Sequence, residues 1–201
     1  MDKNEVRKLI WDNIEKQKLF IPPKSPYGRI PNFRGADFAA KMLRNTEEWI
    51  NSKIIFVSPD SAQIKIREYA LKDKKIVIMA SPKLKYGYLK IDPLNNDINE
   101  KEASTIKGAF KYGLSVDKFP KIDMVIEGSV AVDLEGNRLG KGKGYGDVEI
   151  NHLLNQNVID NKTPIVTTVH ETQIIDNVPT EGHDKKINMI ATPKRVIRIN
   201  I

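Results

Sequence analysis

The feature that most constrains the fold is a strand–helix–strand unit between residues 53 and 80. Lys53 to Val57 is a short run rich in β-branched and aromatic residues, and Ser58-Pro59-Asp60-Ser61 ends it with turn-forming residues. Ala62 to Leu71 then has helical spacing, and a second apolar strand follows at Ile76 to Ala80. Two short strands joined by such a helix pair in parallel through a right-handed crossover, with both sheet faces covered. The unit therefore predicts an α/β fold.

Hydrophobic spacing elsewhere predicts further elements of the same two kinds. Helices are expected at Lys3 to Gln17, at Ala36 to Ile50 with an interruption near Asn45 and Thr46, at Ile98 to Phe110, and at Val148 to Leu154 with Asp147 as N-cap. Strands are expected at Ile122 to Ile126, Val130 to Val132, Pro164 to Val169, Gln173 to Val178, Met189 to Ala191 and Val196 to Ile199, whereas Ser81 to Asp97 is expected to be mobile. Residues 1–201 are thus predicted to form one domain, a three-layer α/β/α sandwich (Rossmann-like) with a mostly parallel central sheet and a ligand site at its strand ends.

Composition excludes several classes of chemistry. The chain has no cysteine and three histidines, so neither a thiolate nucleophile nor a structural zinc cluster is available, and a hydrolytic triad is poorly supported. No apolar run reaches 18 residues and the N-terminal segment is charged, which argues against a membrane partner and a secretory signal. A cytoplasmic location is the resulting expectation.

The positive charge is concentrated in one segment. The formal net charge is +7, and residues 61–90 hold eight Lys or Arg but two acids, a local balance of +6. Such a patch can attract RNA, phosphorylated cofactors or a polycarboxylate tail, although a run of charge is usually a solvated face.

A glycine-rich stretch from Asn137 to Asp147 carries the clearest signal for a ligand. Four glycines alternate there with Lys141, Lys143 and Tyr145, and Asp147 follows directly. Glycines let backbone N–H groups approach an anion, lysines add charge, and a carboxylate offers a hard ligand to Mg²⁺. The spacing is neither that of a P-loop nor that of a dinucleotide fingerprint. The alternatives are a flexible basic turn and, for Asp147, a helix N-cap.

Lys3 and Arg7 lie one helical turn apart near the N-terminus. At this separation both cations project from one side of a helix and could reach a common anion. The alternative is that they lie on the wet side of the helix and bind nothing.

Two distant sets of residues resemble one family. Gly136 to Asp147 is similar to the G-x-R-L-G-x-G-x-G-Y-Y-D motif of the 5-formyltetrahydrofolate cyclo-ligases, also called methenyltetrahydrofolate synthetases. A similar tail recurs at Gln173, Val178-Pro179, His183-Asp184 and Ala191-Thr192-Pro193. Arg29 to Ala36 and Gly128 to Val132 look like the methenyltetrahydrofolate synthetase domain-containing branch, whose members are less securely enzymes and in some cases also carry an RNA-recognition domain.

The resemblance implies an ATP- and Mg²⁺-dependent cyclisation of 5-formyltetrahydrofolate, or a related formylated pterin, to the 5,10-methenyl form through a phosphorylated formyl oxygen. By motif position, Lys3 and Arg7 would clamp the ATP phosphates, and Asp147 and Asp184 would hold Mg²⁺. The residues that would wrap the nucleotide are Arg138, Gly140, Lys141, Gly142, Lys143, Gly144, Tyr145 and Gly146, of which Lys141, Lys143 and Tyr145 would also face the formyl group as catalytic residues.

The sequence departs from the family pattern on the folate side. Gly146 replaces the second tyrosine of the motif, and Pro59 to Gln63 replaces an acidic E-x-x-T segment, for which Asp60 and Gln63 are the candidate substitutes. One alternative is therefore a non-catalytic nucleotide- or RNA-binding module that retains the glycine loop. Another is a sugar-phosphate or CoA-handling enzyme on a similar sheet, because the fold alone does not fix the chemistry.

Overall fold

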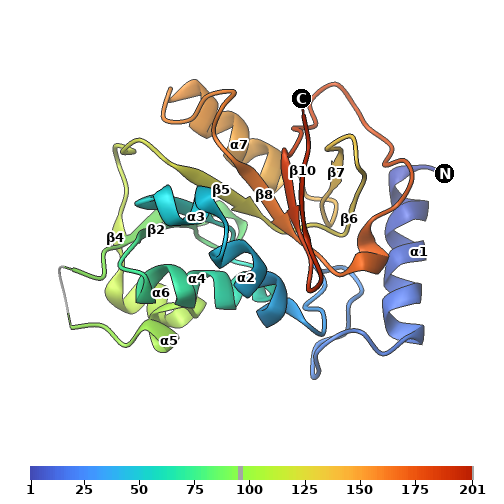
Figure 1. Cartoon of the computed structure of the whole chain (residues 1–201), viewed down its shortest axis with the longest axis horizontal. Helices are drawn as coiled ribbons and strands as arrows, with labels where there is room; N and C mark the ends of the chain where they lie inside the picture. Colours follow the sequence, from blue (N-terminus) through green and yellow to red (C-terminus); the bar gives the residue numbers. More distant parts are fainter. Residues whose placement is uncertain (95–96, 201) are drawn as a thin grey trace.

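The central sheet is mostly parallel, as predicted, and its strand order is β10-β9-β8-β5-β1-β2-β3-β4 (Figure 1). The computed structural model describes residues 1–94 and 97–200. The parallel strands are β9 (Met189–Ala191), β8 (Ile165–Thr168), β5 (Met124–Glu127), β1 (Ile54–Val57) and β2 (Ile76–Ala80). At the two edges the pairing is antiparallel: β10 (Val196–Arg198) pairs with β9, β3 (Tyr88–Ile91) pairs with β2, and β4 (Leu114–Ser115) pairs with β3.

Helices cover both faces of this sheet, which confirms the three-layer sandwich. The layer on one face holds α2 (Ala36–Arg44), α3 (Glu47–Asn51), α4 (Ile64–Lys72), α5 (Glu100–Ala103) and α6 (Ile106–Tyr112). On the other face α7 (Tyr145–Asn155) packs Ile150 and Leu153 against Phe56. Successive side chains of a strand point to opposite faces, so Ile55 and Val57 of β1 enter the first core and Phe56 enters the second.

Helix α1 (Lys3–Lys16) packs beside the sheet on a separate hairpin. The Asp2 side chain accepts hydrogen bonds from the N–H groups of Asn4 and Glu5, and Glu5 bonds back to Asp2, which forms a capping box. One stripe of the helix is buried with Val130 and Leu139, which lie at the hairpin of β6 (Ala131–Val132) and β7 (Arg138–Leu139). This packing places the first turn of α1 next to the loop that follows β7.

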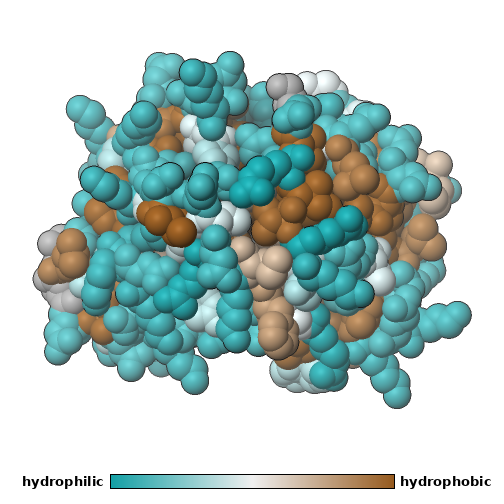
Figure 2. Space-filling view, viewed as in Figure 1, coloured by the Kyte–Doolittle hydropathy of each residue, from teal (hydrophilic) through white to brown (hydrophobic). Residues whose placement is uncertain are grey.

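The surface in this view is largely hydrophilic. Figure 2 shows teal over most of this face, with hydrophobic side chains gathered right of centre around β10. Among the described residues, no helix is both long and apolar enough to cross a membrane.

Several element boundaries differ from the predictions. The expected interruption of the second helix is present, because Thr46 caps α3, and the helix expected at 98–110 is likewise divided, because Thr105 caps α6. Part of the segment expected to be mobile is strand β3, whose backbone pairs with β2. The strand expected at 173–178 is instead a 3₁₀ turn at Glu171–Gln173 followed by a loop. There the buried Gln173 amide donates to the carbonyl oxygens of Ser129 and Val130.

The helix that follows the glycine loop starts earlier than predicted. Its N-cap is Gly144 rather than Asp147, because Gly144 adopts a left-handed conformation (φ 71°) that turns the chain into the helix. Asp147 therefore lies in the first turn of α7, where a carboxylate interacts favourably with the helix dipole.

Candidate active site

A cavity of about 650 Å³ opens at the carboxyl ends of the parallel strands. Ser58, Ser81 and Gly128 directly follow β1, β2 and β5 and line it from the sheet. The first turn of α1, the loop after β7 and residues 181–184 close it from the other side. Open α/β sheets bind ligands at this edge, so the cavity is the candidate active site.

The cavity brings together all the residues predicted to bind ATP or Mg²⁺ or to face the formyl group. Its lining includes Lys3, Arg7, Arg138, Gly140, Lys141, Gly142, Lys143, Gly144, Tyr145, Gly146, Asp147 and Asp184. Of the two candidates to replace the acidic segment, Asp60 lines the cavity, whereas Gln63 is buried and bonds to Ser58 and Thr168. The individual roles of these residues stay predictions.

The glycine loop is shaped to present backbone N–H groups. Gly142 and Gly144 have φ values of 113° and 71°, which side chains disfavour. No side chain caps the first turn of α7, so its N–H groups are free for a ligand at the cavity wall. Arg7 Nε donates to the carbonyl oxygen of Gly140 over 2.8 Å, and a Cβ on Gly142 would lie 3.6 Å from the Arg7 guanidinium carbon. The loop and Arg7 therefore form one packed unit.

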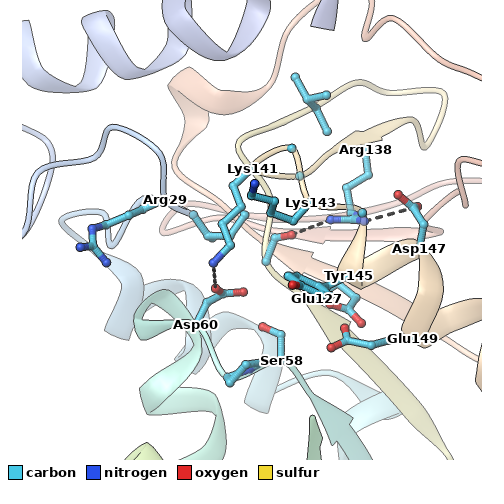
Figure 3. A pocket seen from close by; sticks show the side chains of 18 of the residues that line it. Arg29, Ser58, Asp60, Glu127, Arg138, Lys141, Lys143, Tyr145, Asp147 and Glu149 are labelled. Atoms are coloured by element: carbon cyan, nitrogen blue, oxygen red, sulfur yellow. Dashed lines mark hydrogen bonds and ion pairs between the residues drawn. The ribbon is translucent and has the colours of Figure 1, made fainter. Parts of the chain in front are cut away.

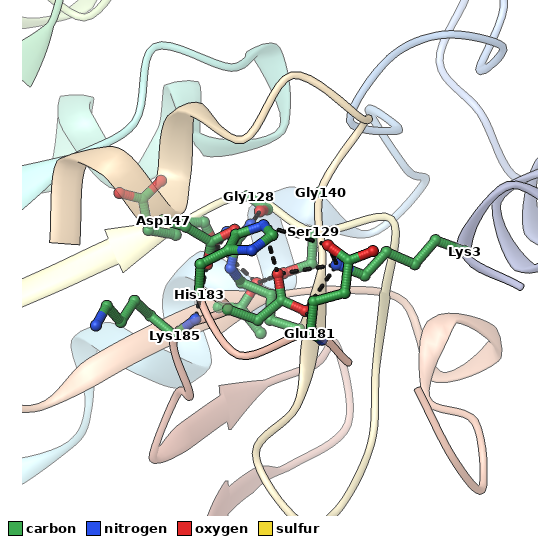
Figure 4. Close-up of polar contacts among 12 residues, drawn as sticks. Lys3, Gly128, Ser129, Gly140, Asp147, Glu181, His183 and Lys185 are labelled. Atoms are coloured by element: carbon green, nitrogen blue, oxygen red, sulfur yellow. Dashed lines mark hydrogen bonds and ion pairs between the residues drawn. The ribbon is translucent and has the colours of Figure 1, made fainter. Parts of the chain in front are cut away.

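Lys3 reaches from α1 to the loop at residues 181–184 (Figure 4). Its Nζ atom lies 2.7 Å from Asp184 Oδ2 and 3.3 Å from Glu181 Oε2. Burial lowers the pKa of Lys3, but the hydrogen bonds and charges of Asp184 and Glu181 outweigh burial and raise the pKa above its ordinary value. Lys3 is therefore a firmly protonated cation bound by two carboxylates.

Two carboxylates were predicted to hold a metal, Asp147 and Asp184. Asp184 belongs to the loop at residues 181–185, and Asp147 contacts that loop from α7. Asp184 has ligand atoms within 4.8 Å of those of Glu181 and His183, a group that could hold an ion. Asp147 accepts a hydrogen bond from the backbone N–H of Lys185 over 2.9 Å, so it contacts the residue next to Asp184. Oxygen ligands of this kind suit Mg²⁺.

Arg138 is buried in the cavity wall and already has protein partners. Its Nη1 atom donates to the carbonyl oxygen of Gly128 over 2.9 Å, and its Nη2 atom lies 3.4 Å from Asp147 Oδ1. A Cβ on Gly146 would lie 2.6 Å from that Nη2 atom. The guanidinium thus lies in the space that a side chain at position 146 would occupy.

Sequence reasoning missed two acids in the cavity floor, Glu127 at the end of β5 and Glu149 in α7 (Figure 3). Burial raises the pKa of Glu127 well above its usual range, and the neighbouring Glu149 raises it further. Burial also raises the pKa of Glu149 to about 7, although the charges of Arg138 and Lys141 oppose the shift. Near neutral pH the pair therefore retains a proton. An acid at the end of a buried strand was the available signal.

The basic segment at residues 61–90 is mostly engaged within the protein. Lys65 and Lys72 both pair with Glu68, Lys74 pairs with Glu100, Lys75 donates to the Ser52 carbonyl, and Arg67 is fully buried. These contacts give much of the segment a structural role, and both the solvated face and RNA binding through the segment stay predictions.

Comparisons with known proteins identify the family. Residues 2–193 match the sequence profile of the 5-formyltetrahydrofolate cyclo-ligase family. The chain is 36% identical over 206 residues to a methenyltetrahydrofolate synthase domain-containing protein of Bos taurus and 34% identical to that of Homo sapiens, covering 98% of this chain in both cases. The matches cover 54% and 53% of those relatives, so the chain spans about half their length.

A solved structure has the same fold. The NMR structure of the Aquifex aeolicus 5,10-methenyltetrahydrofolate synthetase superimposes with a TM-score of 0.62 at 22% identity, covering 100% of this chain and 94% of the other. At this identity the likeness concerns the fold alone. The profile match and the curated relatives together show that the chain belongs to the 5-formyltetrahydrofolate cyclo-ligase family.

Proposed function

We propose that this protein uses ATP and Mg²⁺ to cyclise 5-formyltetrahydrofolate, or a related formylated pterin, to the 5,10-methenyl form through a phosphorylated formyl oxygen. One observation carries the proposal: within a member of this family, a single cavity holds the glycine loop, the uncapped start of α7, and the cations and carboxylates predicted from the motifs.

The cationic end of the cavity fits a polyphosphate. Lys3, Arg7 and Lys143 line it beside the N–H groups of the first turn of α7. Because Arg7 bonds to Gly140, its guanidinium and the glycine loop would contact the same phosphate chain. Positioned cations and backbone dipoles stabilise the charge that spreads over a phosphoryl group during transfer.

Asp147 and Asp184 would hold Mg²⁺, which when bound neutralises charge on the transferred phosphoryl group. The Lys3 ammonium now lies against Asp184, in the position of a counter-ion. On binding of the metal nucleotide, Lys3 would exchange this carboxylate for a phosphate oxygen. The exchange keeps every charge in the site paired.

The folate or pterin substrate supplies both reacting atoms, the formyl oxygen and N10, so the protein's task is to position them. Lys141 and Tyr145 would hold the formyl oxygen in line with the phosphoryl group. After transfer, N10 attacks the formyl carbon, the bond from that carbon to the phosphorylated oxygen breaks, phosphate leaves, and N10 releases its proton. This sequence requires no cysteine or hydrolytic triad, in agreement with the composition.

Following the absorbance of the methenyl product in a mixture of protein, Mg·ATP and 5-formyltetrahydrofolate tests the proposal. Lys143→Ala and Asp147→Asn should each lower turnover by about 10²-fold or more, because each removes a charge stabilising the transferred group. Lys162→Ala, at an exposed position outside the cavity, is the control and should be unaffected.

Absence of turnover with both 5-formyltetrahydrofolate and other formylated pterins would reject the enzyme assignment. Retained Mg·ATP binding in that case would favour the non-catalytic nucleotide-binding module. Full activity in Asp147→Asn would reject the metal role alone.

A further inference from the structure

The cavity floor contains two acidic side chains that the proposed reaction does not use. Glu127 ends β5 in the middle of the sheet, and Glu149 lies in the second turn of α7. Both line the cavity although they are only 2% and 3% exposed. In Figure 3 the two carboxyl groups lie close together below the Tyr145 ring.

The floor contains a buried hydrogen-bond acceptor that lacks a donor. In the described parts of the chain, no group donates a hydrogen bond to Glu127 Oε1, although this atom is buried. The two terminal nitrogens of the nearby Arg138 are directed to the Gly128 carbonyl oxygen and to Asp147, and its buried Nε atom likewise has no partner among the described residues. Buried polar atoms are nearly always paired, so a buried acceptor at a cavity wall without a donor indicates a ligand that supplies one.

We infer that Glu127 and Glu149 select the acceptor substrate by binding two adjacent N–H donors on its ring, as found in a 2-amino-4-oxopyrimidine. The inference rests on the proposed function in one respect: a ring-bearing acceptor shares this cavity with the nucleotide. The carboxyl oxygens of two glutamates at one cavity wall can accept hydrogen bonds from neighbouring donors of a ligand. Such a floor favours a ligand edge rich in donors and disfavours one that presents acceptors.

The distribution of charge along the cavity supports this orientation. Lys3 and Arg7 line the cavity from α1, whereas Asp60 adds a third acid near Glu127, with Lys141 Nζ 3.9 Å from Asp60 Oδ1. Phosphates are therefore attracted more strongly to the end lined by α1 than to the acidic floor. Adenine presents one amino group flanked by acceptor nitrogens, which matches the floor less well than two adjacent N–H donors.

Fluorescence titration of the full chain with two pteridines tests the inference. Pterin carries the 2-amino group, and lumazine has a carbonyl in its place. The wild type should bind pterin about tenfold or more tightly than lumazine, because a site built for a donor rejects an analogue that lacks it. Glu127→Gln preserves size but replaces an acceptor oxygen with an amide donor, and it should remove most of that preference.

Glu135→Gln removes the same charge at an exposed position of the β6–β7 turn and should keep the wild-type ratio of affinities. If Glu127→Gln does not fold, Glu149→Gln provides the same comparison. Equal wild-type affinities, or an unchanged ratio in the floor variants, would overturn the inference. Weakened Mg·ATP binding with an unchanged ratio would also overturn it and assign the floor to adenine.

Turnover of 5-formyltetrahydrofolate by the wild type is measured separately. A preference for pterin that depends on Glu127, without turnover, would reject the proposed function and retain the inference. If the wild type turns over 5-formyltetrahydrofolate but Glu127→Gln leaves the ratio of the pterin and lumazine affinities unchanged, the proposed function is retained and the inference is rejected.

Discussion

At the scale of single residues, the site depends on a contact between a glycine and an arginine. Gly146 breaks the family motif, yet its missing side chain gives room to the Arg138 guanidinium, which joins the Gly128 carbonyl to Asp147. The position of Arg138 in the cavity wall therefore depends on the glycine at position 146. A larger residue would require Arg138 to move.

Gly146→Ala should lower the free energy of unfolding by about 1–2 kcal/mol, because the new Cβ would lie 2.6 Å from Arg138 Nη2. Alanine is favoured over glycine in helices by about 1 kcal/mol, so a net loss measures the clash. Urea unfolding gives this value. Gly182→Ala is the control, because its Cβ would meet no atom within 4 Å, and a stability equal to wild type in Gly146→Ala would contradict the contact.

The buried pair in the floor predicts a dependence of stability on pH. Because the pKa of Glu127 is raised in the folded state, the unfolded chain releases this proton at lower pH, and stability falls as pH rises above about 4.5. Glu127→Gln cannot lose a proton. Its free energy of unfolding relative to wild type should therefore increase between pH 5 and pH 8 in urea titrations, and a constant difference would show that Glu127 ionises normally.

At the scale of elements, the buried side chain of Arg67 joins helix α4 to two loops, the loop after β1 and the loop between α5 and α6. Arg67 in α4 donates to the carbonyl oxygens of Ser58 and Asp60 after β1, and to that of Ser104 between α5 and α6. Burial lowers the pKa of Arg67 to about 10, so it remains charged at neutral pH. This contact fixes the backbone that carries Asp60 into the cavity.

Arg67→Met should destabilise the fold by about 3 kcal/mol or more, because three carbonyl oxygens lose their donor in a buried site. The change in urea midpoint measures this loss. Arg34→Met, at an exposed arginine with one bond to the Lys18 carbonyl, should cost less than about 1 kcal/mol. Similar losses in the two variants would refute the role of Arg67.

The parallel core of the sheet could be predicted because each of its strands is a compact apolar run. Strand β3 was missed because only four residues alternate, within a segment rich in turn formers, and its pairing with β2 depends on tertiary contacts. A strand was wrongly predicted at 173–178. The buried Gln173 amide donates to the backbone of the β6–β7 hairpin there, and the residues that follow form a loop. Motifs located the glycine loop, whereas Glu127 and Glu149 were missed because single acids beside apolar residues carry little local signal.

At the scale of the whole molecule, the cavity has two chemically different ends supported by different elements. Lys3 and Arg7 come from α1, which packs on the β6–β7 hairpin, whereas Glu127 comes from the centre of the sheet. The two ends of the cavity are therefore held in place by different parts of the fold.

The pairing of Lys3 with Asp184 also has a consequence during synthesis of the protein. The two residues are separated by 181 positions, yet they meet in a single ion pair at the phosphate end. A growing chain on the ribosome presents the α1 cations early and lacks their carboxylate partner until nearly all of this domain has emerged. The Lys3–Asp184 ion pair can therefore form only late, after residue 184 has emerged.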